Sequence, residues 1–192
     1  MFRPLLVFLL VITSSLAKAQ TDSIVYNRYL DLNLAVLEGR QFDAEEILEV
    51  ILPDTAKLPL NTRINFYNIA GKLYEDGQSV KAVTYFERVA AAAPGYYVAH
   101  RALGFLYLKE VEEARKKLNA SGGNKQLNAA YIAAVKKALP HLEKAQACDP
   151  SPETLAIITS LYKGIKDPEG LSSLDARLAE AQKKCIDILD AR

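Results

Sequence analysis

The chain has 192 residues, of which 50% are hydrophobic and 24% are charged. Its 24 basic and 23 acidic residues nearly cancel, so bulk charge does not favour nucleic-acid binding. A chain of this length buries roughly 70% of its unfolded surface in one core, which predicts a folded domain rather than disorder.

The first residues predict a secretory signal peptide. Arg3 supplies a positive charge, residues 5–12 form an apolar run, and Ala17-Lys18-Ala19 has the Ala-x-Ala form of a cleavage site. A membrane anchor is the alternative, but the apolar run is shorter than the roughly 20 residues that span a bilayer. We therefore expect a signal peptide over residues 1–19 and a periplasmic or secreted protein with no membrane span after cleavage.

Apolar residues then recur at helical spacing, and turn residues divide the helices into hairpins. Residues 26–51 are predicted to form a degenerate first hairpin with Gly39 in its turn. From Asn61 two further helices follow, which are broken at Gly77 and ended by Pro94-Gly95. Neither helix is long enough to bury an apolar face alone, so we expect other hairpins to stack on this pair.

A similar pattern returns downstream. The first helices share small and apolar positions, namely Ile69, Ala70 and Leu73 in one and Leu103, Gly104 and Tyr107 in the other. The second helices repeat at an interval of 56 residues, which separates Ala82 from Ala138 and Pro94 from Pro150. A 34-residue unit with a 22-residue insertion accounts for this interval.

This pattern resembles the tetratricopeptide repeat (TPR) family, in an exported bacterial form. The matching units cover residues 63–96 and 97–150, the second with an insertion near residues 110–131. The matched residues are Phe66, Ile69, Ala70, Leu73, Ala82, Phe86, Val89 and Pro94, then His100, Leu103, Gly104, Tyr107, Ala138, Leu142, Ala145 and Pro150. The resemblance implies an all-α fold for residues 20–192, in which antiparallel helical hairpins stack as an α-solenoid with one elongated hairpin.

The insertion and the C-terminal segment complete the expected architecture. The helix after Tyr107 continues to a turn at residues 119–124, and a second long helix returns through Pro140, where a kink is expected. The charged residues of the insertion are expected to face water, with docking of a partner near Gly122 as the alternative. A third unit keeps only Leu155, Ile158 and Tyr162, and an amphipathic helix over residues 173–189 is expected to close the stack.

The cysteines and histidines do not form a recognisable site. Cys148 and Cys185 are two partly buried thiols in the favoured interpretation and a disulfide in the alternative, because spacing alone cannot bring their Cα atoms together. His100 stands at a core position of the repeat, and His141 lies on another helix of the same unit. Known catalytic motifs are absent, so we expect no enzyme activity, no metal and no cofactor.

The resemblance also implies a binding surface, because the first helix of each repeat lines the concave face in that family. The positions transferred to this chain give a partner-binding groove of Tyr29, Tyr67, Tyr74, Arg101, Phe105 and Lys109. Tyrosine and arginine are frequent binding anchors. In the alternative interpretation these aromatic residues pack against neighbouring helices. Gly71 and Phe105 stand where a carboxylate clamp needs asparagine, so recognition of chaperone tails is not expected.

These features predict a non-catalytic scaffold that binds a protein or peptide of the bacterial cell envelope. One alternative is a glycan-binding or small-molecule-binding accessory protein of an outer-membrane uptake system. Another is a self-assembling structural module. The sequence leaves open the identity of the partner and the oligomeric state.

Overall fold

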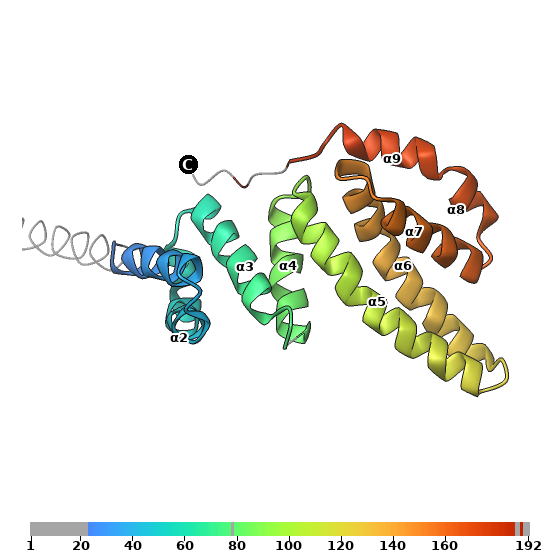
Figure 1. Cartoon of the computed structure of the whole chain (residues 1–192), viewed down its shortest axis with the longest axis horizontal. Helices are drawn as coiled ribbons and strands as arrows, with labels where there is room; N and C mark the ends of the chain where they lie inside the picture. The colour runs from blue at the N-terminus through green and yellow to red at the C-terminus, as the bar shows by residue number, and fades with distance from the viewer. Residues whose placement is uncertain (1–22, 78, 187–188, 190–192) are drawn as a thin grey trace, which may run out of the picture. The chain divides into compact units, whose positions relative to one another are not determined.

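The computed structural model describes residues 23–77, 79–186 and 189. These residues are almost entirely helical (Figure 1), which confirms the expected all-α class. The predicted signal peptide lies outside them. No helix in the described ranges combines the length and the apolar content needed to cross a bilayer. The chain divides into two compact units, of which the first ends at Phe66 and the second begins at Tyr67.

The first unit contains a helix over residues 23–37, α2 (Gln41–Ile51), the short 3₁₀ helix η1 (Leu52–Lys57) and the start of α3 (Leu60–Tyr74). Gly39 lies in the turn before α2, as expected, with a φ of 69° that glycine adopts without strain. The buried core residues of the two helices are Val25, Tyr29, Leu32, Ala35, Ala44, Leu48 and Ile51.

The second unit contains two hairpins of unequal length and a C-terminal group of helices. The rest of α3 pairs with α4 (Ser79–Ala92), and α5 (Tyr97–Ala120) pairs with α6 (Lys125–Cys148). These are followed by α7 (Pro152–Gly164), α8 (Pro168–Ser172) and α9 (Leu174–Gln182). The elongated hairpin predicted from the insertion is therefore present, with 24 residues in each of its two helices.

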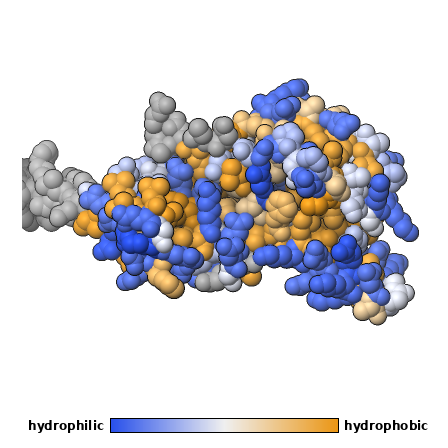
Figure 2. All heavy atoms as spheres, viewed as in Figure 1, coloured by the Kyte–Doolittle hydropathy of each residue, from blue (hydrophilic) through white to orange (hydrophobic). Residues whose placement is uncertain are grey.

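The far ends of α5 and α6 reach beyond α4 and α7 (Figure 1). Figure 2 shows hydrophilic surface gathered over this end of the hairpin on the face in view. The exposed charged residues of the insertion include Glu112, Glu113, Arg115, Lys116 and Lys117, as expected for a solvated face. Helix α6 runs through Pro140 without interruption.

Two glycines allow the paired helices to approach closely. A Cβ atom on Gly71 would lie 2.8 Å from ring atoms of Phe86, and one on Gly104 would lie 2.7 Å from Cδ2 of Leu142. Gly71 and Gly104 are therefore equivalent positions of the two hairpins, because each lies in the first helix beneath a large side chain of the second.

This equivalence corrects the expected register of α3 by one residue. Ala70, Gly71 and Tyr74 are buried and stand where Leu103, Gly104 and Tyr107 stand in α5, whereas the predicted core residues Ile69 and Leu73 are only partly buried. The first helices consequently repeat after 33 residues, whereas the second helices repeat after 56, so the long hairpin carries 23 additional residues instead of 22. Both registers place a small residue before a large one, which is why the pattern alone selected the wrong one.

Tyrosine hydroxyls connect each hairpin to the helix that follows. The hydroxyl of Tyr107 on α5 donates a hydrogen bond to Oε1 of Glu87 on α4 at 2.5 Å. The hydroxyl of Tyr162 on α7 donates to Oε1 of Glu143 on α6, also at 2.5 Å. The same donor and acceptor types thus recur where the second helix of a hairpin meets the next first helix.

The C-terminal segment differs from the sequence prediction. Helix α9 ends at Gln182 and does not continue to residue 189. Cys185 forms a disulfide with Cys148 at the end of α6, with a Cα–Cα distance of 5.5 Å. The favoured interpretation of two separate thiols was therefore wrong. The return of the chain after α9 brings the two cysteines together across 37 positions of sequence.

Candidate functional site

The partner-binding residues predicted on α5 lie along one side of that helix. Arg101, Phe105 and Lys109 follow one another at intervals of four residues, so they share a face. Phe105 is 42% exposed, although Leu103 and Leu106 beside it are buried. We refer to Arg101, Phe105 and Lys109 as the α5 face.

The two cations of the α5 face have neighbours of their own. The guanidinium of Arg101 pairs with Asp149 and lies 5.3 Å from the centre of the Tyr97 ring. Lys109 lies near Glu75, which follows the end of α3. Burial and the charge of Asp76 raise the pKa of the Glu75 carboxyl, and the charge of Lys109 opposes this shift. The positive charge of the α5 face is therefore partly balanced by the carboxylates of Asp149 and Glu75.

An open hollow with a volume of about 580 Å³ runs along α7. Its lining residues are Pro152, Leu155, Ala156, Thr159, Ser160 and Lys163. Asp149, the partner of Arg101, lies three residues before Pro152, the first residue of α7. The ion pair therefore places the Arg101 end of the α5 face near the start of the hollow.

Two other predicted groove residues of the second unit pack within the protein. Tyr67 and Tyr74 both stack on Tyr85 of α4, with ring centres 6.1 and 6.0 Å apart. Tyr74 is only 3% exposed. The guanidinium of Arg88 lies 4.9 Å from the Tyr67 ring centre. These contacts correspond to the packing alternative, and the one-residue change in register explains why Tyr74 points inward.

Tyr29 also fails to provide binding surface. It belongs to the first unit and is 8% exposed, with its ring 6.1 Å from that of Tyr26. The structure thus brings together Arg101, Phe105 and Lys109 as surface residues, whereas Tyr29 and Tyr74 belong to the core.

The two histidines meet between α5 and α6. The Nδ1 atoms of His100 and His141 lie 3.1 Å apart, so one ring donates a hydrogen bond to the other. Burial, together with His141 and Lys144, lowers the pKa of His100 to about 4. Burial also lowers the pKa of His141, although Glu87 opposes this effect. Both rings are consequently neutral near pH 7, in keeping with the core or interface role expected for His100.

A smaller pocket of about 320 Å³ lies where α6, α7 and α9 meet. Arg177 binds Glu143 through Nε and Nη2 at 2.9 and 2.7 Å, and Nη2 also donates to the Tyr162 hydroxyl at 2.7 Å. Burial and the hydrogen bond to Glu143 raise the pKa of Tyr162 to about 12. The polar groups here satisfy one another, which marks a structural junction.

The described residues hold no group of three His, Cys, Asp or Glu side chains able to bind a metal ion. Absence of enzyme activity and of a cofactor stays a prediction. Sequence reasoning missed the histidine pair, although one signal was present. Tyr85 and His141 are 56 residues apart, the same interval that separates Phe86 from Leu142. His141 is therefore equivalent to Tyr85, and His100 is equivalent to Tyr67, so the contact between the two tyrosines corresponds to the contact between the two histidines.

No family model matches the chain, and neither a curated protein nor a solved structure matches it. The resemblance to TPR proteins consequently depends on the repeated residues and on the contacts that recur between equivalent positions.

Proposed function

We propose that the chain is a helical-repeat scaffold of the TPR type. Two kinds of recurring contact support this proposal. Within each hairpin of the second unit a glycine of the first helix meets a large side chain of the second, and a tyrosine hydroxyl of the following helix meets a glutamate of the hairpin. Stacked repeats of this kind typically use the concave face, which their first helices line, as an extended binding surface.

We further propose that the α5 face and the hollow along α7 bind an extended segment of a partner protein without catalysis. The observation that carries this proposal is the exposure of Phe105. Exposing so large an apolar ring to water is unfavourable, whereas aromatic residues beside arginine are typical anchors of protein interfaces. The ion pair of Arg101 with Asp149 directs the same surface toward the hollow.

The hollow suits a peptide with an apolar side chain. Pro152, Leu155 and Ala156 offer apolar walls, while the hydroxyls of Thr159 and Ser160 can bind a peptide backbone. Lys163 at the far end can pair with an acidic group. The expected ligand is therefore an extended peptide with an apolar residue followed by a polar or acidic one.

Two specific observations favour other functions. The hollow has the volume of a small-molecule site, and Phe105 could stack on a sugar ring, as in a glycan-binding accessory protein. Saturable binding of glycans and no binding of peptides would select this function. The first unit exposes Leu30, Leu34 and Leu37, as a self-assembling module would. An apparent mass that rises with protein concentration would select self-assembly.

We propose that the protein works in the periplasm or outside the cell. The disulfide between Cys148 and Cys185 supports this location, because such bonds persist mainly in oxidising compartments. The predicted signal peptide gives the same location from the sequence. Mass spectrometry of the exported protein checks it, with a first residue of Gln20 as the expected result.

A displayed peptide library tests the binding function. Peptides selected on the purified protein are titrated against Phe105→Ala, Arg101→Ala and the control Phe42→Ala, which removes a ring of the first unit that is 88% exposed. We expect Phe105→Ala to weaken binding by about 30-fold or more, the effect of losing an anchor residue. Arg101→Ala should weaken it less, and Phe42→Ala should leave it unchanged. Equal affinities for all four proteins would refute the assignment.

Affinity capture from the native cell envelope extends this test to natural partners. The unaltered protein and the Phe105→Ala/Arg101→Ala variant serve as parallel baits. We expect the variant to lose the main partner while retaining nonspecific ones. Recovery of the same partners by both baits would show that binding uses another surface.

A further inference from the structure

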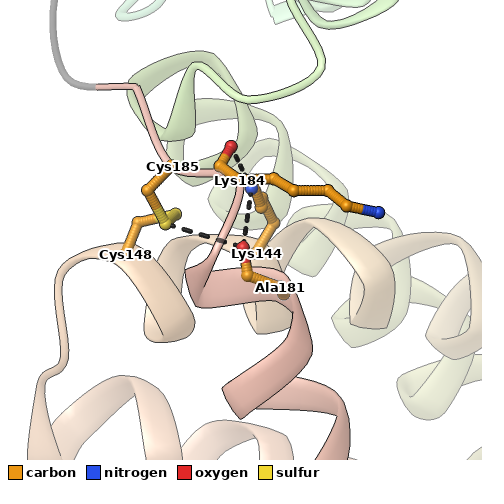
Figure 3. Close-up of a disulfide and its surroundings, with 5 residues drawn as sticks. All are labelled: Lys144, Cys148, Ala181, Lys184 and Cys185. Atoms are coloured by element: carbon orange, nitrogen blue, oxygen red, sulfur yellow. Dashed lines mark hydrogen bonds between the residues drawn. A yellow bond between two sulfur atoms is a disulfide. The ribbon is translucent and has the colours of Figure 1, made fainter.

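Residues 183–186 follow α9 and cross back toward the turn between α4 and α5; we call them the C-terminal strap. The disulfide from Cys185 to Cys148 fixes the strap to the end of α6 (Figure 3). The bond is the covalent link between the strap and the hairpin that carries the α5 face.

A buried lysine provides a second attachment. Lys144 of α6 is 9% exposed, and its ammonium group donates hydrogen bonds to the carbonyls of Ala181 and Lys184 at 3.1 and 3.0 Å. Figure 3 shows these bonds beside the disulfide. Burial and the charge of Lys184 lower the pKa of Lys144. The ammonium depends on these two carbonyls, one in α9 and one in the strap, because a buried charge without partners is costly.

The end of the strap binds the start of α5. The backbone N–H of Ile186 donates to the carbonyl of Gly95 at 2.9 Å, and the N–H of Tyr97 donates to the carbonyl of Ile186 at 3.4 Å. A Cβ atom on Gly95 would lie 2.5 Å from both Cγ1 of Ile186 and the carbonyl oxygen of Lys184. The turn therefore requires glycine where the strap lies against it.

The bond from Tyr97 supplies a cap that α5 otherwise lacks. Tyr97 is the first residue of α5, and the N-cap residue Tyr96 makes no side-chain capping bond. The first N–H groups of a helix need partners from outside it. The strap thus satisfies a donor only four residues before Arg101, while Cys148 immediately precedes Asp149, the partner of Arg101.

We propose that the disulfide is a redox switch that controls the order of the α5 face. This inference rests on the proposed function, since it concerns regulation of the same surface. In the oxidised protein the strap caps α5 and holds both ends of the Arg101–Asp149 pair. After reduction the strap leaves Gly95, the first turn of α5 opens more often, and Arg101 is no longer held beside the hollow.

The switch operates through thiol–disulfide exchange with a dithiol. One thiolate of the dithiol attacks a sulfur of the disulfide, and its second thiolate then resolves the mixed disulfide. The bond between Cys148 and Cys185 breaks, an S–S bond forms in the reagent, and two protons pass to the released cysteine thiolates. The cysteines gain two electrons and the dithiol loses them.

Hydrogen exchange measures the switch without any ligand. Amide exchange is compared in the oxidised protein, the dithiothreitol-reduced protein and Cys148→Ser/Cys185→Ser, with reduction verified by thiol alkylation. We expect the amides of residues 97–101 to exchange at least tenfold faster after reduction, with α4 unchanged. Unchanged exchange at residues 97–101 overturns the proposal, and so does an equal increase in every helix.

A second variant separates the strap from the disulfide itself. Ile186→Pro keeps both cysteines but cannot donate to Gly95, whereas Ile186→Val keeps the N–H. With the disulfide intact, Ile186→Pro should also speed exchange at residues 97–101, and Ile186→Val should not. Normal protection in Ile186→Pro would show that the bond from Ile186 to Gly95 does not hold the strap against α5.

Binding of a library-selected peptide connects the switch to the α5 face. We expect the reduced protein to bind the peptide at least fivefold more weakly than the oxidised protein. Equal affinity overturns control of the site by the disulfide. Failure of Phe105→Ala to weaken the same peptide instead refutes the proposed function, and it leaves the exchange result unaffected.

Discussion

The two hairpins of the second unit carry the same contacts with different chemistry. In the shorter hairpin Tyr85 touches Tyr67 and Tyr74, and at the equivalent positions of the longer hairpin His141 touches His100 and Tyr107. The first cluster consists of three tyrosine rings. The second contains two groups that protonate in acid. One packing arrangement therefore tolerates either apolar stacking or a hydrogen-bonded titratable pair.

The cations beside these clusters are also equivalent. Lys81 lies 4.5 Å from the ring centre of Tyr74, and Lys137 lies 4.0 Å from that of Tyr107. Arg88 covers Tyr67 at 4.9 Å, whereas the equivalent Lys144 donates to the carbonyls of Ala181 in α9 and Lys184 in the strap. The longer hairpin has thus exchanged a cation over a ring for an attachment to the C-terminal segment.

The largest effect is expected when the side chain that packs over Gly71 or Gly104 is removed, which tests whether the two hairpins have equivalent cores. Phe86→Ala should lower the free energy of unfolding by about 3–5 kcal/mol and Leu142→Ala by about 2–5 kcal/mol, because both leave a cavity in a packed core. Denaturant titration measures both, and Val80→Ala on the exposed side of α4 is the control. If either core variant lost no more stability than Val80→Ala, the two positions would not be equivalent parts of the core.

The next largest effect is expected in acid, which should destabilise the fold through the histidine cluster of the longer hairpin. Unfolded histidine protonates near pH 6.5, whereas the pKa of His100 is lowered to about 4 in the folded protein. Between these values the unfolded chain binds more protons, so stability falls as pH decreases and levels off near pH 4. We expect a loss on the order of 2 kcal/mol from this group.

The double variant His100→Tyr/His141→Tyr copies the Tyr67–Tyr85 pair and should remove this part of the pH dependence. The groups facing the pair are Lys137 and Lys144 of α6 and Glu87 of α4. Denaturant titrations at a series of pH values measure the difference between the two proteins. If the free energy of unfolding changed with pH in the same way in both proteins from pH 7 to pH 4, the histidine pair would not be the cause of the loss of stability in acid.

Removal of the tyrosine hydroxyls between hairpins should have a smaller effect. Tyr162→Phe deprives Glu143, which is 12% exposed, and Arg177 of a shared partner, so we expect a loss of about 2 kcal/mol. Tyr107→Phe affects Glu87, which remains in water, and should cost about 1 kcal/mol. Thermal unfolding compares the two variants. A larger loss for Tyr107→Phe would reverse the expected order.

The cations over the rings should matter least. Lys81→Gln is expected to cost about 0.5 kcal/mol, as for an exposed cation–π contact. Lys137→Gln should cost slightly more, because Lys137 also bonds Glu110 of α5 at 3.3 Å. Denaturant titration at low and high salt measures both. If salt left the difference between the two variants unchanged, the ion pair would not explain it.

The sequence predicted the helices and the long hairpin because their signals are local. Helical spacing, the turn glycine Gly39 and the unbroken helix after Tyr107 require no knowledge of distant contacts. The register of α3 was less determined, because Ile69-Ala70-Leu73 and Ala70-Gly71-Tyr74 both fit a small residue followed by a large one. Only the contact of Gly71 with Phe86 separates the two.

The site was predicted in part for the same reason. Phe105 and Arg101 were predicted as surface residues from the positions that the TPR resemblance assigns to the concave face, whereas the burial of Tyr29 and Tyr74 depends on what covers them. The disulfide, the histidine pair and the strap join residues that are far apart in sequence. Amphipathic spacing extended the last helix to residue 189, since it contains no information about the pairing of Ile186 with Gly95.

Chemical-shift mapping tests the proposed binding surface most directly. A library-selected peptide is titrated into the isotope-labelled oxidised protein, and shifts are followed at every assigned amide. We expect saturable changes confined to residues near Arg101, Phe105 and Lys109 and to the lining of the α7 hollow. Saturable changes confined to the helix over residues 23–37, or to the tip of the long hairpin near Gly122, would contradict this account.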